Sequence, residues 1–233
     1  SHGVVFSPET ARINEFSVKN TDVSLTLGSI ESTDTVPSEP LYWKILLDEI
    51  DFENVGFALK MPQDSLFVRT MLPKTTLKNG VIDLKEASYY VKSFGIDNAE
   101  LAYGPKEELF LQQIGLQLDS IYYCGKDIRA NIEEFVLKER SGLELVSTEG
   151  RIVSDSVLIE IPKFTMKTTA SSLDLQTKIG WDVLEMKKTG VLSAKINAEI
   201  GKGDVAKILG GRDTLFLQTY PNKPFVFRAD AEG

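Results

Sequence analysis

The chain has almost no histidine or cysteine, and this excludes most of the catalytic and metal-binding sites found in proteins. Its 233 residues contain one histidine, His2, and one cysteine, Cys124. Because the only histidine lies at the very tip of the chain, we exclude catalytic triads, cysteine–histidine pairs and histidine metal sites. A single cysteine also forms no internal disulfide. We therefore expect no enzyme and no cofactor or metal, and we interpret Cys124 as an inert strand residue.

Basic clusters and long apolar runs are also missing. The formal net charge is −8, and the longest lysine run is Lys187-Lys188. Nucleic acids and anionic membrane surfaces require a concentrated basic patch, so neither is expected as a partner. No apolar run is long enough to cross a bilayer, and the first residues do not form a signal peptide. We interpret the chain as an internal fragment of a longer protein that lacks its targeting and anchoring segments.

What the sequence does contain is an alternation of apolar and polar residues. The runs 23–27 (VSLTL) and 164–166 (FTM) are examples, and glycine, proline, asparagine and aspartate separate such runs. Period-two alternation predicts strands with one dry face and one wet face. Asn79-Gly80 lies between apolar residues and predicts a hairpin turn. Gly150 lies where we expect a strand to end.

An internal repeat is the most informative part of this pattern. Apolar residues separated by three and then two positions precede an asparagine, after which apolar alternation resumes. Three full copies begin at Ile13, Leu47 and Val91, a fourth at Leu111 has Leu118 in place of the asparagine, and looser copies begin at Ile132 and Ile161. Uneven spacing favours a long meandering sheet over a strict solenoid. Apolar alternation also imitates a repeat in other all-β proteins, so that alternative stays open.

The predicted fold class is all-β, with a long, repetitive, strongly curved sheet and one or two short helices. We expect one continuous domain over residues 1–233. Residues 28–40, rich in serine, threonine, proline and glutamate, are expected to form a long exposed loop. A short helix is predicted over residues 204–210, where a pair of glycines ends it.

Carboxylates gather in one of the predicted strands, around Asp48. Glu49, Asp51 and Glu53 alternate with apolar residues and fall on one strand face, which a solvated outer surface explains. The glycine-containing loop of a calcium site is missing there.

The repeat units resemble a known family. Residues 13–27 (INEFSVKNTDVSLTL), 47–59 (LDEIDFENVGFAL) and 91–105 (VKSFGIDNAELAYGP) resemble the strand repeats of AsmA-like, TamB-like (translocation and assembly module) bacterial envelope proteins. Residues 192–211 and 220–233 are similar to a strand, short helix and following segment of Bacteroidetes-type members.

The resemblance implies an elongated, U-shaped (taco-like) trough with a hydrophobic interior. Family members are anchored in the inner membrane, cross the periplasm and conduct phospholipid towards the outer membrane. They also support outer-membrane biogenesis and protein secretion with an Omp85-type partner. The resemblance therefore implies a non-enzymatic, periplasmic protein, anchored in its full-length form, whose groove binds phospholipid acyl chains. That groove would be lined by Ile13, Phe16, Val18, Leu47, Ile50, Phe52, Val91, Phe94, Ile96, Ile114, Leu116, Phe135, Leu137, Phe164 and Met166.

Two alternatives remain at this point. The apolar face could instead be sealed as the core between two packed sheets, because a core and a lipid groove both require one dry face. The chain could also be a structural or chaperone-like module that binds β-barrel precursors through exposed sheet edges.

Overall fold

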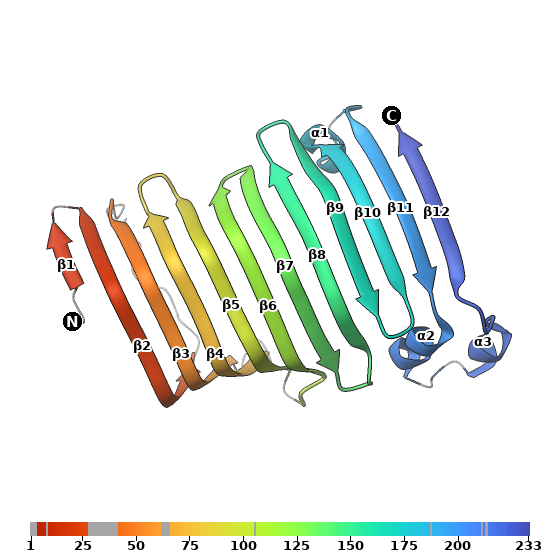
Figure 1. Cartoon of the computed structure of the whole chain (residues 1–233), viewed down its shortest axis with the longest axis horizontal. Helices are drawn as coiled ribbons and strands as arrows, with labels where there is room; N and C mark the ends of the chain where they lie inside the picture. Colours follow the sequence, from red (N-terminus) through yellow and green to blue (C-terminus); the bar gives the residue numbers. More distant parts are fainter. Residues whose placement is uncertain are drawn as a thin grey trace. The chain divides into compact units, whose positions relative to one another are not determined.

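The computed structural model is all-β, with long hydrogen-bonded strands and, among the described residues, three short helices, which confirms the predicted fold class (Figure 1). The structure describes residues 4–233 except 8, 28–41, 62–65, 105, 187, 211 and 213. The loop expected at 28–40 lies outside the described residues. Contacts divide the chain into two compact units, Ser1–Gly115 and Leu116–Gly233.

The first unit consists of strands that follow one another in chain order. They are β1 (Val4–Ser7), β2 (Thr10–Thr26), β3 (Lys44–Met61), β4 (Leu66–Asp83), β5 (Ser88–Tyr103) and the first part of β6 (Leu109–Cys124). β2 and β3 are parallel, whereas β3, β4 and β5 pair antiparallel. Strands of 16 to 18 residues are far longer than the usual five or six, so each can bend and still pair along its length.

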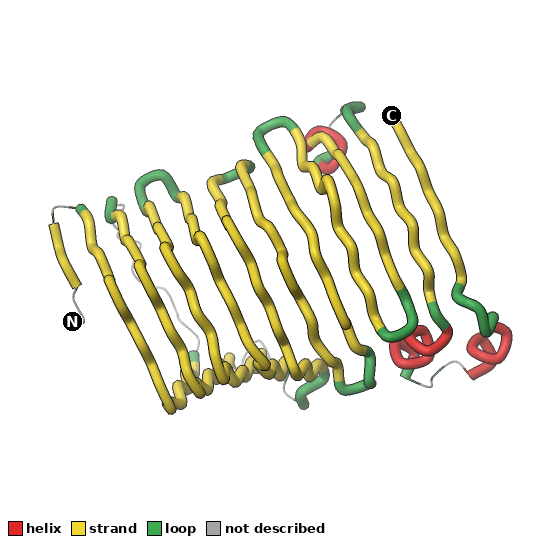
Figure 2. The backbone as a smooth tube through the Cα atoms, viewed as in Figure 1, coloured by secondary structure: helices red, strands yellow, loops and turns green. Residues whose placement is uncertain are grey.

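The second unit contains the remainder of β6 and a run of antiparallel strands with helices at their ends (Figures 1 and 2). The elements are β7 (Asp127–Glu139), β8 (Glu144–Ser154), β9 (Leu158–Thr168), β10 (Ser172–Gly180), α1 (Trp181–Leu184), β11 (Leu192–Ile200), α2 (Lys202–Leu209), α3 (Thr214–Thr219) and β12 (Phe225–Glu232). Helix α2 is the helix expected at 204–210, and Gly210 ends it in the left-handed conformation. None of the described helices is long and apolar enough to cross a membrane.

The asparagines of the repeat form a row across the first unit. Asn20 and Asn54 lie opposite each other between paired residues of β2 and β3, and the same registers place Asn98 of β5 in this row. All three have positive φ, between 50° and 55°, and the Asn54 side-chain amide donates to the Asn20 Oδ1 at 3.2 Å. Asparagine tolerates this left-handed conformation better than most residues, which explains the repeat. Each asparagine reverses the strand alternation without ending the strand.

Replacing Asn54 with valine is expected to lower the free energy of unfolding by about 1–3 kcal/mol, because a β-branched residue is strained at positive φ. Urea denaturation followed by circular dichroism measures the loss. Glycine at the same position adopts this conformation freely and should cost less than about 1 kcal/mol. Equal losses for the two variants would show that backbone strain is not the cause.

Two turn predictions were wrong. Asn79-Gly80 is not a hairpin but lies inside β4, which pairs with β3 and β5 on both sides of this position. Asn79 does have the left-handed φ, 53°, that such a turn requires, but here it only interrupts the strand alternation. Gly150 lies in the middle of β8 rather than at a strand end.

Helix α2 is fixed to the β9–β10 hairpin by a buried carboxylate. Asp204 is 3% exposed and accepts hydrogen bonds from the hydroxyls of Thr168, Thr169 and Ser171. Gly201, just before the helix, lies so close to the hairpin that an added Cβ would stand 2.1 Å from the Ala170 carbonyl oxygen. The helix therefore closes the end of a hairpin rather than covering a face of the sheet.

Candidate functional site

Nine of the predicted groove residues come together in three rows across the first unit. Each row contains residues directly opposite one another on β2, β3, β4 and β5. The rows are Ile13–Leu47–Gly80–Val91, Phe16–Ile50–Leu77–Phe94 and Val18–Phe52–Thr75–Ile96. Directly opposite residues share a sheet face, so residues from distant parts of the sequence form one surface.

These three rows lie on the same face. The rows of Phe16 and Val18 are two residues apart, and the Phe16 and Phe52 rings contact edge to face with centroids 6.4 Å apart. A Cβ added to Gly80 would stand 3.0 Å from Leu77 Cδ2 and 3.2 Å from Leu47 Cβ. The Leu77 side chain therefore lies over Gly80 and joins the outermost row to the other two. We call the nine predicted residues with Leu77 and Thr75 the apolar face of the first unit.

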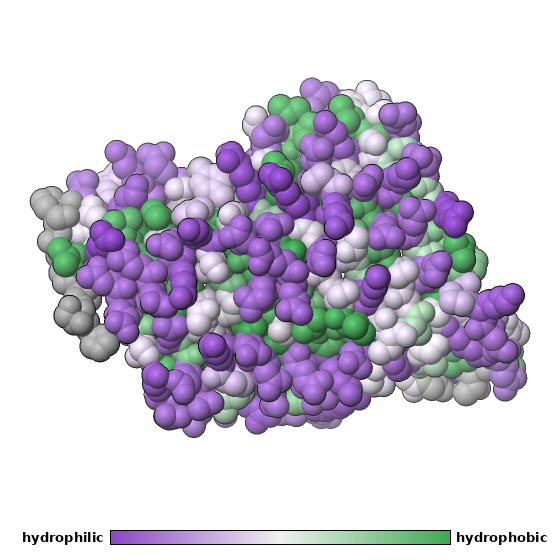
Figure 3. All heavy atoms as spheres, in the orientation of Figure 1, coloured by the Kyte–Doolittle hydropathy of each residue, from purple (hydrophilic) through white to green (hydrophobic). Residues whose placement is uncertain are grey.

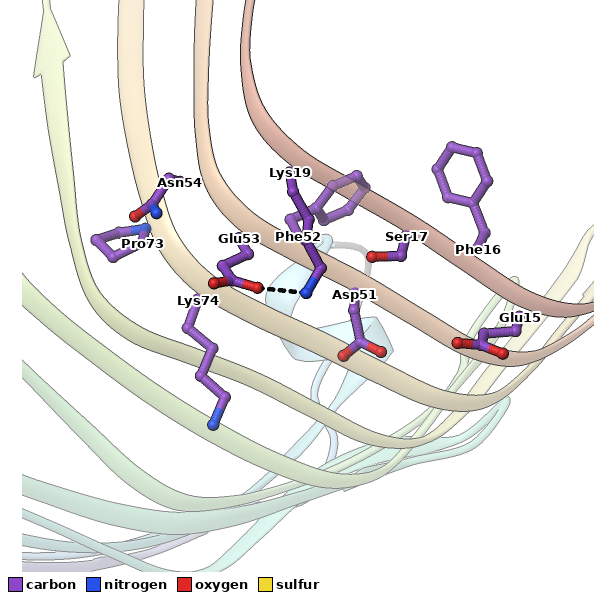
Figure 4. A pocket seen from close by; sticks show the side chains of 10 residues that line it. All are labelled: Glu15, Phe16, Ser17, Lys19, Asp51, Phe52, Glu53, Asn54, Pro73 and Lys74. Atoms are coloured by element: carbon purple, nitrogen blue, oxygen red, sulfur yellow. Dashed lines mark ion pairs between the residues drawn. The ribbon is translucent and has the colours of Figure 1, made fainter. Parts of the chain in front are cut away.

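The bend places this face on its inner side. In Figure 4 the strands curve, and the rings of Phe16 and Phe52 project to the inside of the curve. The side chains of Asp51 and Lys74 project to the outside. A hollow of 870 Å³ adjoins this bend, lined by Phe16 and Phe52 together with charged residues of the other sheet face, such as Lys19 and Glu53. The rings of Phe16 and Phe52 therefore lie on the concave side of the sheet, and the charged side chains lie on its other side.

The apolar face is only half covered. Phe16 is 46% exposed, and the other fourteen predicted groove residues are neither fully buried nor fully exposed. Among the described residues, the buried apolar side chains are Ala11, Val55, Ala99 and Ala102, and none of the large side chains is fully buried. A sealed core between two sheets would contain fully buried large apolar residues. No second layer covers the described part of this face.

The opposite face is a ladder of charges. Lys19 Nζ lies 2.6 Å from Glu53 Oε2, and Lys78 Nζ lies 2.8 Å from Glu49 Oε1, each pair joining adjacent strands. The hydrogen bond and charge of Lys19 lower the pKa of Glu53, and those of Glu53 raise the pKa of Lys19. Hydrophilic residues also predominate on the face visible in Figure 3. The sheet of the first unit therefore has one charged face that contacts water and one apolar face.

The second unit repeats this division. Phe164 of β9 lies opposite Gly150 and Leu175, in a row that continues to Ile196 of β11. Met166 lies in the next row on the same face, opposite Leu173. On the other face, between these rows, Thr165, Asp174, Asn197 and Arg228 form a polar row.

The remaining predicted residues lie in β6 and β7. Leu137 of β7 is opposite Leu145 of β8. Phe135 lies where the described ladder between these strands is interrupted. Ile114 and Leu116 both lie in β6 and are half-buried.

Gly150 provides space for the Phe164 ring. A Cβ at this position would stand 2.7 Å from Phe164 Cδ2, which real contacts do not allow. Gly150→Val is expected to lower the free energy of unfolding by about 1–3 kcal/mol through overpacking. Adding Phe164→Leu should restore part of that loss, and a double-mutant cycle in urea measures the coupling. Strictly additive losses would contradict the contact.

Sequence analysis missed Leu77 and Thr75, which complete two of the rows. Both lie in β4, the strand that the Asn79-Gly80 hairpin prediction divided in two. Reading residues 66–83 as one strand would have placed them on the apolar face. The Thr75 hydroxyl is buried and has no hydrogen-bond partner among the described residues.

The described residues were searched for side-chain groups that could bind a metal ion. They include no group of three or more histidine, cysteine, aspartate or glutamate side chains that could hold a metal ion. No family model, curated protein or solved structure matches this chain. The most distinctive feature of the described residues is the sheet of the first unit, with a water-facing ladder of charges on one face and a half-exposed apolar surface on the other.

Proposed function

We propose that the apolar face binds phospholipid acyl chains and that the protein conducts lipid without catalysing a reaction. The observation that supports this most directly is the half-covered state of the large apolar residues. A row such as Phe16–Ile50–Leu77–Phe94 exposes apolar surface to water unless a ligand covers it. Contiguous apolar surface of this kind is typical of a binding site in a soluble protein.

The chemistry of the two faces fits an amphipathic ligand. An acyl chain gains about 0.8 kcal/mol for each methylene removed from water. Successive apolar rows offer similar contacts, so a chain could move along them at nearly constant free energy. The charged face that includes Lys19 and Glu53 stays in contact with water on the other side of the sheet.

The proposal also includes a cellular location and a partner. A lipid conduit between inner and outer membranes would place the chain in the periplasm, anchored to the inner membrane in the full-length protein. The resemblance to AsmA-like, TamB-like proteins adds a role in outer-membrane biogenesis and an Omp85-type partner.

Mass spectrometry of organic extracts from the purified, folded protein tests the proposal. We expect phospholipid at a fixed ratio to protein, and a matched sheet protein without an open apolar face should carry none. Extracts that stay free of lipid, from a folded sample expressed with membranes intact, would overturn it.

A second candidate is a module that binds protein clients by strand addition. The outer edge of β2 favours this candidate. Strand β1 pairs with this edge only at Thr10–Ile13, and no described strand pairs with the rest of it. Crosslinking in cells separates the two functions. Capture of unfolded outer-membrane proteins together with a lipid-free extract would favour the client-binding module.

A further inference from the structure

The charged face of the first unit contains a hollow with a largely apolar floor. Its volume is 450 Å³, and it is lined by residues of β2 to β5 and by Phe110 of β6. Two rows of directly opposite residues form its base, Asp22–Gly56–Met71–Glu100 and Ser24–Ala58–Arg69–Ala102. Because the asparagines of the repeat reverse the strand alternation, both rows lie on the side opposite the apolar face. The hollow is therefore separate from the proposed lipid surface.

Small side chains create this space. Gly56 and Ala58 of β3 and Ala102 of β5 leave room that larger residues would fill. Ala102 is 1% exposed, whereas Met71, on the strand between β3 and β5, is 42% exposed. A methionine adapts its shape to an apolar neighbour, and Phe110 adds an aromatic ring to the lining. The floor of the hollow therefore favours an aliphatic group.

Two carboxylates belong to one row of the hollow. Asp22 lies over Gly56, where an added Cβ would collide with its Oδ1, and Glu100 lies at the other end of the row. Neither carboxylate has an ion-pair partner among the described residues. The remaining charged residue of the hollow, Arg69, lies 2.7 Å from Glu107 Oε1, so its charge is already compensated. An apolar space between two uncompensated carboxylates complements an aliphatic group flanked by two cations.

The spacing of the carboxylates indicates the form of this ligand. The strands of Asp22 and Glu100 are three strand spacings apart, roughly 14 Å. In an extended peptide, residues i and i+4 are about 13 Å apart, and residues i, i+2 and i+4 project to the same side. A peptide that crosses the strands along this row therefore places two side chains at the carboxylates and a third between them.

We propose that the hollow binds an extended segment of a partner protein in which an aliphatic residue lies two positions from a lysine or arginine on each side. The two cations pair with Asp22 and Glu100, and the aliphatic side chain fills the space beside Ala58 and Met71. Lipid on the apolar face plays no part in this contact, so the proposed function and this proposal can fail separately.

Two peptides of equal composition test the order of residues in the partner. Blocked Lys-Ser-Leu-Ser-Lys projects its leucine to the same side as both lysines, whereas in Lys-Ser-Ser-Leu-Lys the leucine projects to the other side. NMR titration of the isotope-labelled chain measures both affinities. We expect the first peptide to bind at least about tenfold more tightly, because only its leucine is buried in the hollow. Equal affinities, or no binding of the first peptide, would overturn the proposal.

Variants of the hollow locate the binding site. Ala58→Leu fills the space and should weaken binding of the first peptide at least about tenfold. Asp22→Asn and Glu100→Gln leave the packing unchanged, and each should weaken binding by about two- to fivefold, as expected for exposed ion pairs. Asp174→Asn, an exposed carboxylate of the second unit, is the matched control and should change nothing. Equal affinity for all four variants would overturn the proposal.

Two further measurements distinguish other occupants. Butylammonium should bind at least about tenfold more weakly than the first peptide, because it supplies one cation rather than two. Equal binding of butylammonium would overturn the proposal in favour of a small organic cation. Light scattering should show that Ala58→Leu leaves the oligomeric state of the chain unchanged. A wild-type dimer that this variant converts to monomers would overturn the proposal in favour of a second copy of the chain.

Discussion

Placing aspartate at Phe52 should reduce phospholipid co-purification by roughly tenfold or more while leaving the fold intact. Phe52 lies on the inside of the bend, in edge-to-face contact with Phe16. A carboxyl group beside an acyl chain lacks hydrogen-bond partners, which costs about 1–3 kcal/mol, and each 1.4 kcal/mol is a factor of ten in affinity. Quantitative mass spectrometry of lipid per protein measures the effect.

Two variants serve as controls for this experiment. Phe52→Leu keeps an apolar side chain and should retain lipid. Ser93→Asp adds a carboxylate to the polar face, in the row of Lys78, and should also leave lipid unchanged.

Stability measured on Phe52→Asp distinguishes an open face from a sealed core. On an open face, the carboxylate reaches water, and the free energy of unfolding should fall by less than about 2 kcal/mol. Loss of a large aromatic from a sealed core costs about 3–5 kcal/mol before any charge is buried. Loss of folding together with loss of lipid would therefore contradict the groove and favour a core.

Replacing Asp204 with alanine should lower the free energy of unfolding by about 2–4 kcal/mol, the largest stability effect we expect from a single substitution. The change leaves the hydroxyls of Thr168, Thr169 and Ser171 without their shared acceptor. Urea denaturation measures the loss. Asp174→Asn, an exposed carboxylate on the polar face of β10, is the control and should change stability by less than about 0.5 kcal/mol.

The Asp204 contribution should also depend on pH. Burial raises the pKa of Asp204, but hydrogen bonds from Ser171 and Thr168 and the charge of Lys207 outweigh it, so the folded pKa lies below the usual value. A carboxylate with a lowered pKa stabilises the fold fully above its unfolded pKa of about 3.9, and the stabilisation is lost as pH falls through the folded pKa. The gap in stability between wild type and Asp204→Asn should therefore narrow below about pH 4. A gap that stays constant from pH 7 to pH 3 would contradict the shift.

The alternation of apolar residues predicted the strands correctly, whereas turn-forming residues did not predict where the strands end. Alternation at residues 13–25 and 47–59 predicted strands that the structure has in β2 and β3. Asn79-Gly80 has the composition of a tight turn, but Lys78 and Gly80 pair with β3 on one side and with β5 on the other, so the strand continues past Asn79. A left-handed asparagine ends a strand when no partner continues beside it and bends the strand when partners do. The pairing partners are distant in sequence, so the residue alone does not decide between these outcomes.

The sequence by itself determined which side of each strand is apolar, because side-chain direction alternates with residue number wherever the backbone is extended. It also determined where the alternation is interrupted, since an asparagine follows the second apolar residue of each full repeat by four positions, at Asn20, Asn54 and Asn98, and each of them has positive φ. Only the tertiary structure decided whether those apolar sides are covered. Coverage depends on what packs opposite a face, and in the described residues nothing lies over Phe16, Phe52 or Phe94 that would bury them fully.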